Sequence, residues 1–144
     1  MSDAPVPAAS RIAVVAARNE ADRIAATIAS LRTASPGIAI VVADDASDDG
    51  TGRVALEAGA EVVSRGRPHG KGGNMTAACE AALTGAGSAD LFLLCDGDLG
   101  ETAGRLVPLL EAVESNECDL AIAAFSRRVG GGVGAAKGFA RSAI

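Results

Sequence analysis

Two aspartates separated by one glycine follow an apolar segment in the second half of the chain. The stretch Leu91–Glu101 reads LFLLCDGDLGE, so Asp96 and Asp98 stand at the end of a predicted strand. In an extended chain these two side chains point to the same side, and Gly97 lets the backbone approach a ligand closely. Carboxylate oxygens suit Mg²⁺ or Mn²⁺ when water and phosphate oxygens complete the shell. The pattern favours a divalent metal site over a solvated Asp-Gly turn.

A second acidic turn has the same form. The stretch Val41–Thr51 reads VVADDASDDGT, an apolar segment followed by four aspartates and the start of a predicted helix. Such carboxylates can accept a hydrogen bond from the imide N–H of uracil or the amide edge of guanine, or they can cap the helix. We assign capping to Asp48 and Asp49, and nucleobase recognition to Asp44 and Asp45.

A basic, glycine-rich loop precedes another predicted helix. It spans Arg65–Gly73 and reads RGRPHGKGG. Backbone N–H groups and the Lys71 ammonium could meet a diphosphate there, and a flexible surface loop is the alternative. The loop is not a Walker A motif, because Gly72 occupies the position that needs a metal-binding Ser or Thr.

The elements that must position these turns alternate along the chain. Short apolar segments rich in Val, Ile, Leu and Ala predict five strands, namely Ile12–Ala17, Ile38–Ala43, Glu61–Ser64, Leu91–Cys95 and Leu120–Phe125. Helical patterns lie between them, at Ile24–Leu31, Asp49–Ala58, Gly73–Thr84 and Leu106–Val113. This order predicts an α/β fold with a mostly parallel sheet flanked by helices. Ligands of such sheets bind beyond the carboxyl ends of the strands, where all of the polar clusters fall.

Composition limits the classes of function. With 144 residues the chain fits one domain, which we place at residues 11–144 after a disordered leader at residues 1–10. The net charge of -5 and the 2% of aromatic residues argue against nucleic acid as a partner. No apolar run is long enough to cross a bilayer, which predicts a soluble chain. Cys79, Cys95 and Cys118 are odd in number and widely spaced, which indicates reduced thiols in a cytoplasmic protein.

Together the turns resemble the nucleotide-binding half of a family 2 glycosyltransferase with the Rossmann-like GT-A fold. The likeness covers Arg11 to about Phe125. The family motifs P-A-Y-N-E, D-D-G-S-x-D-G-T, G-K-G and D-x-D correspond, in order, to Ala16–Glu20, Asp44–Thr51, Gly70–Gly72 and Asp96–Asp98. Ala16 and Arg18 depart from the usual Pro and Tyr.

The resemblance implies a nucleoside diphosphate sugar, UDP- or GDP-linked, as donor and a lipid or saccharide as acceptor. It implies that Ala17, Glu20 and Asp45 border the nucleoside and that Asp44 supports or shares that contact. Lys71 would lie near the base or the diphosphate, and Gly97 would lie at the sugar nucleotide. Asp98, with help from Asp96, would hold Mg²⁺ or Mn²⁺.

The resemblance also implies that the catalytic base, a carboxylate in this family, lies beyond Ile144. We therefore expect a truncated domain without its acceptor half, and membrane contact, at the inner face, only through residues beyond this chain. One alternative is a nucleotide-binding fragment without catalytic activity. Another is a sugar-phosphate nucleotidyltransferase, which is less favoured because the first strand is followed by Ala17-Arg18-Asn19-Glu20 and not by a basic glycine-rich loop.

Overall fold

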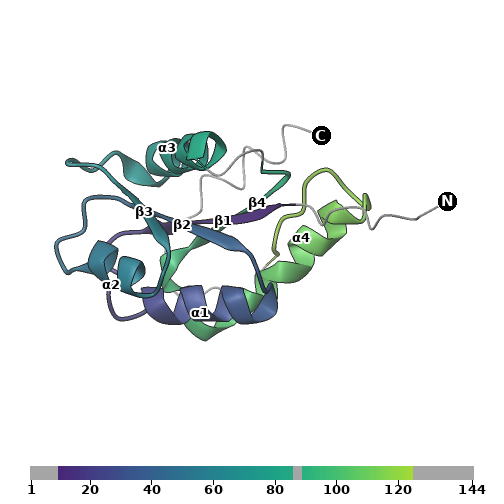
Figure 1. Ribbon diagram of the computed structural model, residues 1–144, viewed down its shortest axis with the longest axis horizontal. Coiled ribbons are helices and arrows are strands. Elements are labelled where there is room, and N and C mark those ends of the chain that lie inside the picture. The colour runs from purple at the N-terminus through teal and green to yellow at the C-terminus, as the bar shows by residue number, and fades with distance from the viewer. Residues whose placement is uncertain (1–9, 86–88, 125–144) are drawn as a thin grey trace.

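The computed structural model describes residues 10–85 and 89–124 (Figure 1). The strands are β1 (Arg11–Ala17), β2 (Ala39–Asp44), β3 (Glu61–Ser64) and β4 (Leu91–Asp96). The helices are α1 (Ile24–Ala34), α2 (Thr51–Glu57), α3 (Gly70–Gly85) and α4 (Val107–Glu114). A 3₁₀ segment, η1 (Gly97–Leu106), joins β4 to α4 and is kinked at Gly100.

The four strands form one parallel sheet in the order β3-β2-β1-β4. The strands β1 and β2 are almost wholly buried because both have a neighbour on each side and helices on both faces, as their continuous apolar sequences predict. Ala17 pairs with Asp44, and Ala16 pairs with Asp96. This register brings the acidic ends of β2 and β4 to one edge of the sheet, on either side of β1.

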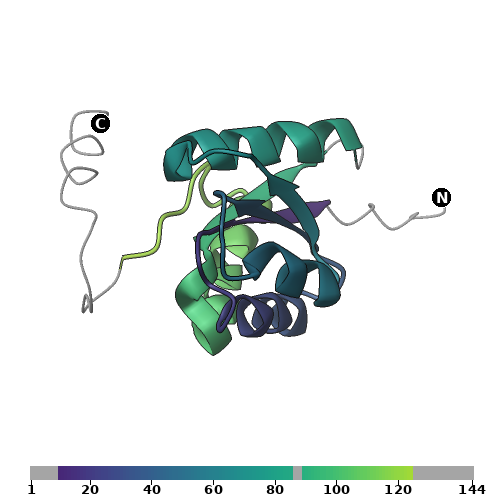
Figure 2. The same cartoon turned by 90° about the vertical axis from the view of Figure 1, so that its left-hand side faces the viewer.

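Helices cover the two faces of the sheet unequally (Figures 1 and 2). On one face α1, α2, η1 and α4 enclose the larger apolar cluster, which includes Ile24, Ile28 and Leu31 of α1. On the other face α3 is the covering helix among the described residues, and its buried apolar contacts with β1 and β2 come from Ala78 and Ala82. The described architecture confirms the predicted α/β fold, with a thick apolar layer on one face and a thin, alanine-lined layer on the other.

The predicted fifth strand is not formed in the described part of the chain. Residues 120–124 carry no strand, Leu120 and Ile122 are 73% and 72% exposed, and Phe125 lies outside the described residues. An apolar run becomes a strand only where a neighbour supplies backbone partners, and this segment does not pair with β4. The apolar pattern was therefore a wrong guide to this strand.

Helix ends and faces also differ from the predicted ones. The helix predicted from Asp49 begins at Thr51, whereas the helix predicted from Gly73 begins three residues earlier, at Gly70. In η1 and α4 the buried face consists of Ala103, Val107 and Leu110. Leu106, Leu109, Leu110 and Val113 form the apolar spacing that predicts this helix. Leu110 is buried, the other three are half-buried, and Leu106 lies in the kinked 3₁₀ segment.

Several expectations concern residues outside the described ranges. The predicted leader lies there except for Ser10, and so do residues 125–144 of the predicted domain. Within the described ranges, no helix has the length and apolar character that a membrane span requires.

Candidate functional site

A pocket of about 350 Å³ lies where the carboxyl ends of β1, β2 and β4 meet the first turn of α3. Seven of the eight predicted site residues line this strand-end pocket, and Asp44 is the exception. The parallel register explains the convergence, because it aligns the strand ends in one row. Lys71, in the first turn of α3, reaches the same place from the face of the sheet that α3 covers.

The neighbours Asp44 and Asp45 point to opposite faces of the sheet. Successive side chains alternate along a strand, and Val42 packs on the α1 face while Ala43 packs on the α3 face. Asp44 follows the side of Val42, where it accepts hydrogen bonds from the backbone and hydroxyl of Ser47 and, at 3.3 Å, from the Ser64 hydroxyl. Its carboxylate is thus occupied within the scaffold and lies outside the pocket lining.

Asp45 faces α3 and joins the pocket to that helix. Its Oδ1 accepts from the N–H of His69 at 2.7 Å, and its Oδ2 accepts from the N–H of Gly70 at 3.2 Å. These bonds satisfy orphan donors at the start of α3, as an N-terminal cap does. Asp45 therefore holds in place the turn that presents Lys71.

Asp96, at the end of β4, pairs with Lys71. The Lys71 Nζ lies 2.6 Å from Asp96 Oδ1, and the two side chains are 61% and 50% exposed. Asp98 is exposed at the pocket and makes no hydrogen bond or ion pair with another described residue. Within residues 10–85 and 89–124, no three His, Cys, Asp or Glu side chains gather closely enough to hold a metal ion by themselves. The protein thus offers the two predicted carboxylates, one paired with a lysine and one free.

Gly97 sets the distance between the acidic end of β4 and the neighbouring strand. A Cβ at this position would lie 3.1 Å from Ala17 Cβ and 3.2 Å from the Ala16 carbonyl oxygen. Those contacts are closer than ordinary van der Waals contact, so a side chain would push β4 away from β1. Gly97 thus allows β4 to lie close to β1, and its approach to a ligand stays a prediction.

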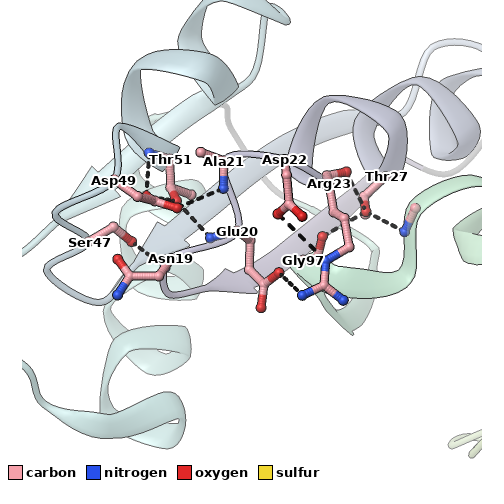
Figure 3. Close-up of polar contacts among 11 residues, drawn as sticks. Asn19, Glu20, Ala21, Asp22, Arg23, Thr27, Ser47, Asp49, Thr51 and Gly97 are labelled. Atoms are coloured by element: carbon pink, nitrogen blue, oxygen red, sulfur yellow. Dashed lines mark hydrogen bonds and ion pairs between the residues drawn. The ribbon is translucent and has the colours of Figure 1, made fainter. Parts of the chain in front are cut away.

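A hydrogen-bonded network fixes the loop that follows β1 (Figure 3). The Glu20 N–H donates to Thr51 Oγ1 at 2.9 Å, and the Ala21 N–H donates to Asp49 Oδ2 at 3.0 Å. Asp49 also accepts from the hydroxyl and the N–H of Thr51, and these hydrogen bonds lower the pKa of its carboxyl. Asp49 therefore ties the start of α2 to the loop that carries Glu20.

The Glu20 carboxylate lines the pocket in a largely buried position. Burial raises its pKa, and the nearby Asp98 adds to the increase, while the Arg23 guanidinium opposes it. Arg23 Nη2 lies 3.0 Å from Glu20 Oε2, an ionic contact without hydrogen-bond geometry. The negative charges of Glu20 and Asp98 create a local potential that favours a cation at this side of the pocket.

Thr27 of α1 holds the backbone that carries Asp98. Its hydroxyl donates to the Gly97 carbonyl at 2.8 Å and accepts from the Gly100 N–H at 2.8 Å (Figure 3). Sequence analysis missed this residue because a threonine within a helical pattern looks like an ordinary surface or core position. Its two contacts with η1 span 70 and 73 positions of sequence.

Cys95 precedes the acidic turn as a buried thiol. Burial, together with the charges of Asp96 and Asp98, raises the pKa of the Cys95 thiol to about 12. A protonated thiol is a weak nucleophile at neutral pH. All three cysteines are free.

A larger groove of about 640 Å³ follows the edge of β4 toward α4. It is lined mostly by apolar residues, and its charged lining residues are three aspartates without a basic partner in the lining, so its chemistry does not suggest a phosphate ligand. The strand-end pocket is the candidate site.

The parallel sheet flanked by helices is the predicted GT-A fold. Residues 12–139 match the family described as Glycosyl transferase family 2. The match covers most of the chain, and the chain belongs to this family. The predicted resemblance is thereby confirmed.

Named relatives are glycosyltransferases. Undecaprenyl-phosphate mannosyltransferase of Micrococcus luteus is 34% identical over 126 residues, covering 84% of this chain and 49% of that protein. The chain thus spans about half the length of this curated relative.

Solved structures of two sugar-phosphoglycerate synthases share the fold. Mannosyl-3-phosphoglycerate synthase from Rubrobacter xylanophilus is 35% identical with a TM-score of 0.52, over 62% of this chain and 31% of that one. Glucosyl-3-phosphoglycerate synthase from Mycobacterium tuberculosis is 30% identical with a TM-score of 0.61, over 76% and 42% of the two chains. Its complex with Mn²⁺, UDP and glucosyl-3-phosphoglycerate is 27% identical with a TM-score of 0.58, over 74% and 39%.

Proposed function

We propose that this chain carries the donor-binding part of a glycosyltransferase that moves a sugar from a UDP- or GDP-linked donor to an acceptor hydroxyl. The observation that supports the proposal is the meeting of Lys71, Asp96 and Asp98 in one strand-end pocket. A lysine there is suited to bind phosphate oxygens. Complexes of related structures contain UDP or UDP-glucose together with Mn²⁺.

Asp96 and Asp98 would hold Mg²⁺ or Mn²⁺. Their hard oxygen atoms fit these ions, and a site with only two protein carboxylates fits an ion that keeps water and phosphate oxygens as its other ligands. When bound, the ion would supply Lewis-acid stabilisation of the departing diphosphate.

The remaining pocket residues would orient the donor. Lys71 would contact the diphosphate after releasing Asp96, and its place is set by the hydrogen bonds of Asp45 to the start of α3. Ala17, Glu20 and Asp45 would border the nucleoside. Asp44 would support the turn after β2 through its hydrogen bonds with Ser47 and Ser64, which lie outside the pocket lining.

The acceptor is proposed to be a lipid or a saccharide, with the base that deprotonates its hydroxyl supplied by residues outside the described ranges. The relatives named above act on different acceptors, among them undecaprenyl phosphate and phosphoglycerate by their names. The donor pocket is therefore the part of the proposal that this chain can test directly.

The test is isothermal titration calorimetry with UDP and with GDP, each with and without Mn²⁺. We expect at least one nucleotide to bind about tenfold or more tightly with Mn²⁺, and Asp98→Asn to remove most of that gain. Asp48→Asn is the matched control, because Asp48 is an exposed aspartate of the other acidic turn and lies outside the pocket lining. Metal-independent binding in the wild type would contradict the metal bridge, and failure to bind either nucleotide would contradict the proposed function.

A further inference from the structure

Asn74 is a buried amide on the inner face of α3. Its side chain is 1% exposed, and it lines the strand-end pocket. Neither Oδ1 nor Nδ2 has a hydrogen-bond partner among residues 10–85 and 89–124. Buried polar side chains are nearly always hydrogen-bonded, because burial without a partner destabilises the folded state. An amide with both atoms unpaired therefore needs an explanation.

Packing does not explain the asparagine. Positions 74, 78 and 82 are spaced four apart and lie on the same face of α3, and the other two are Ala78 and Ala82, which pack on β1 and β2. An alanine at position 74 would continue this stripe and would also have the higher helix propensity. The amide is present at a structural disadvantage in the free protein.

The residues that line the pocket with Asn74 do not occupy its side-chain amide, so the amide can hydrogen-bond to a ligand. The neighbouring pocket residues Ala16 and Ala43 have no polar side-chain atoms. Asp45 already uses both carboxylate oxygens on the start of α3, and Asp96 is paired with Lys71. Asn74 is thus the buried lining residue of this pocket, within the described ranges, that offers a free donor next to a free acceptor.

We propose that Asn74 reads the base of the bound nucleotide, which rests on the proposed function above. A phosphate offers only acceptors and would leave Oδ1 unpaired. The edge of uracil with N3–H beside O4, and the edge of guanine with N1–H beside O6, each offer a donor next to an acceptor. Oδ1 accepts from the ring N–H, and Nδ2 donates to the adjacent carbonyl. Base recognition is then a task of Asn74, while Asp45 mainly fixes α3.

The first test measures binding by Asn74→Ala with the nucleotide that the wild type binds more tightly, UDP or GDP, in the presence of Mn²⁺. We expect affinity about tenfold lower, because two hydrogen bonds to the base are lost. Affinity for pyrophosphate should stay within twofold of wild type. Thr76→Ala is the matched control, since Thr76 is exposed on the same helix and its substitution should leave both affinities unchanged.

A methylated ligand identifies the group that is read. N3-methyl-UDP, or N1-methyl-GDP, lacks the ring N–H, so it should bind the wild type more weakly than its parent but bind Asn74→Ala about as well as its parent does. If Asn74 contacted the ribose instead, Asn74→Ala would weaken binding of the parent and the methylated ligand equally. That result would overturn the proposed recognition of the base. Equal weakening of pyrophosphate binding would overturn it too.

Thermal unfolding without ligand separates a recognition role from a structural one. Asn74→Ala should unfold at a temperature no lower than wild type, whereas a lower midpoint would show that the amide has a partner in the free protein and would overturn the proposal. If Asn74→Ala binds the nucleotide as tightly as the wild type does, the proposed role of Asn74 is refuted while the proposed function stands. If the wild type binds neither UDP nor GDP, the proposed function fails and the role of Asn74 fails with it.

Discussion

The acidic turn after β2 and the acidic turn after β4 have similar sequences and opposite hydrogen bonding. In the first, Asp44, Asp45 and Asp49 all accept hydrogen bonds from backbone N–H groups or hydroxyls. In the second, Asp96 has only the ammonium of Lys71 as a side-chain partner among the described residues, and Asp98 has none. One turn uses its carboxylates to hold the surrounding loops together, and the other leaves its carboxylates partly or wholly exposed at the strand-end pocket.

The backbone of the β4 turn is nevertheless well anchored. Thr27 binds both ends of the short segment from Gly97 to Gly100, and Gly97 itself is buried against β1. Free carboxylates on a fixed backbone are what a preorganised binding site requires, since little reorganisation is then needed when the ligand arrives. The two turns thus differ in the hydrogen bonding of their side chains and not in how well their backbones are anchored.

The largest expected contrast is in stability. Asp44→Ala should lower the free energy of unfolding by about 2 to 3 kcal/mol, because it removes a buried carboxylate that accepts hydrogen bonds from Ser47 and Ser64. Asp98→Ala should change it by less than about 0.5 kcal/mol, since no contact is lost. Urea denaturation of both variants measures the difference, and equal losses would show that the two turns do not differ in the way described.

A second contrast uses two glycines that differ in available space. Gly97→Ala should lower the free energy of unfolding by about 2 kcal/mol, because the added methyl meets Ala17 and the end of β1. Gly72→Ala is the control: nothing lies within 4 Å of a Cβ there, and the residue is in helix α3. It should gain about 0.5 to 1 kcal/mol. If Gly97→Ala is as stable as Gly72→Ala, the β4 turn is not held by close contact with β1.

The smallest effect concerns the Lys71–Asp96 ion pair. Lys71→Met should raise the affinity of the nucleotide-free protein for Mn²⁺ by up to about fivefold, because an exposed ion pair of this kind contributes at most about 1 kcal/mol. Arg53→Met is the control, because it removes the exposed ion pair between Arg53 and Glu57. It should leave the affinity for Mn²⁺ unchanged. Mn²⁺ binding can be followed by electron paramagnetic resonance. An unchanged or lower affinity in Lys71→Met would indicate that the lysine does not compete with the metal for Asp96.

Sequence analysis predicted the architecture and the family because both depend on local patterns. The continuous apolar runs of β1 and β2 and the alternation with helices define a parallel sheet, and the position of each polar cluster after a strand predicts the edge where the clusters meet. The prediction of a fifth strand was wrong because strand formation does not depend on the local pattern alone. The apolar run at Leu120 encodes a tendency to burial, whereas a strand also needs a neighbour to pair with.

The individual roles of polar residues needed the tertiary structure. Strand alternation does predict that Asp44 and Asp45 face opposite sides, but only the packing of α2 and α3 shows which side is scaffold and which is pocket. A break in the alanine spacing marks Asn74 in the sequence, although its burial and unpaired amide become visible only in the fold.

The amino-acid sequence by itself determined the parallel α/β architecture, the family and the strand ends where the site forms, because hydrophobic periodicity and short motifs act over a few neighbouring residues. The tertiary structure alone decided which carboxylates are occupied and which are free. The hydrogen bond between Thr27 and Gly97 and the ion pair between Lys71 and Asp96 each join distant parts of the chain, and these contacts depend on how the helices pack on the two faces of the sheet.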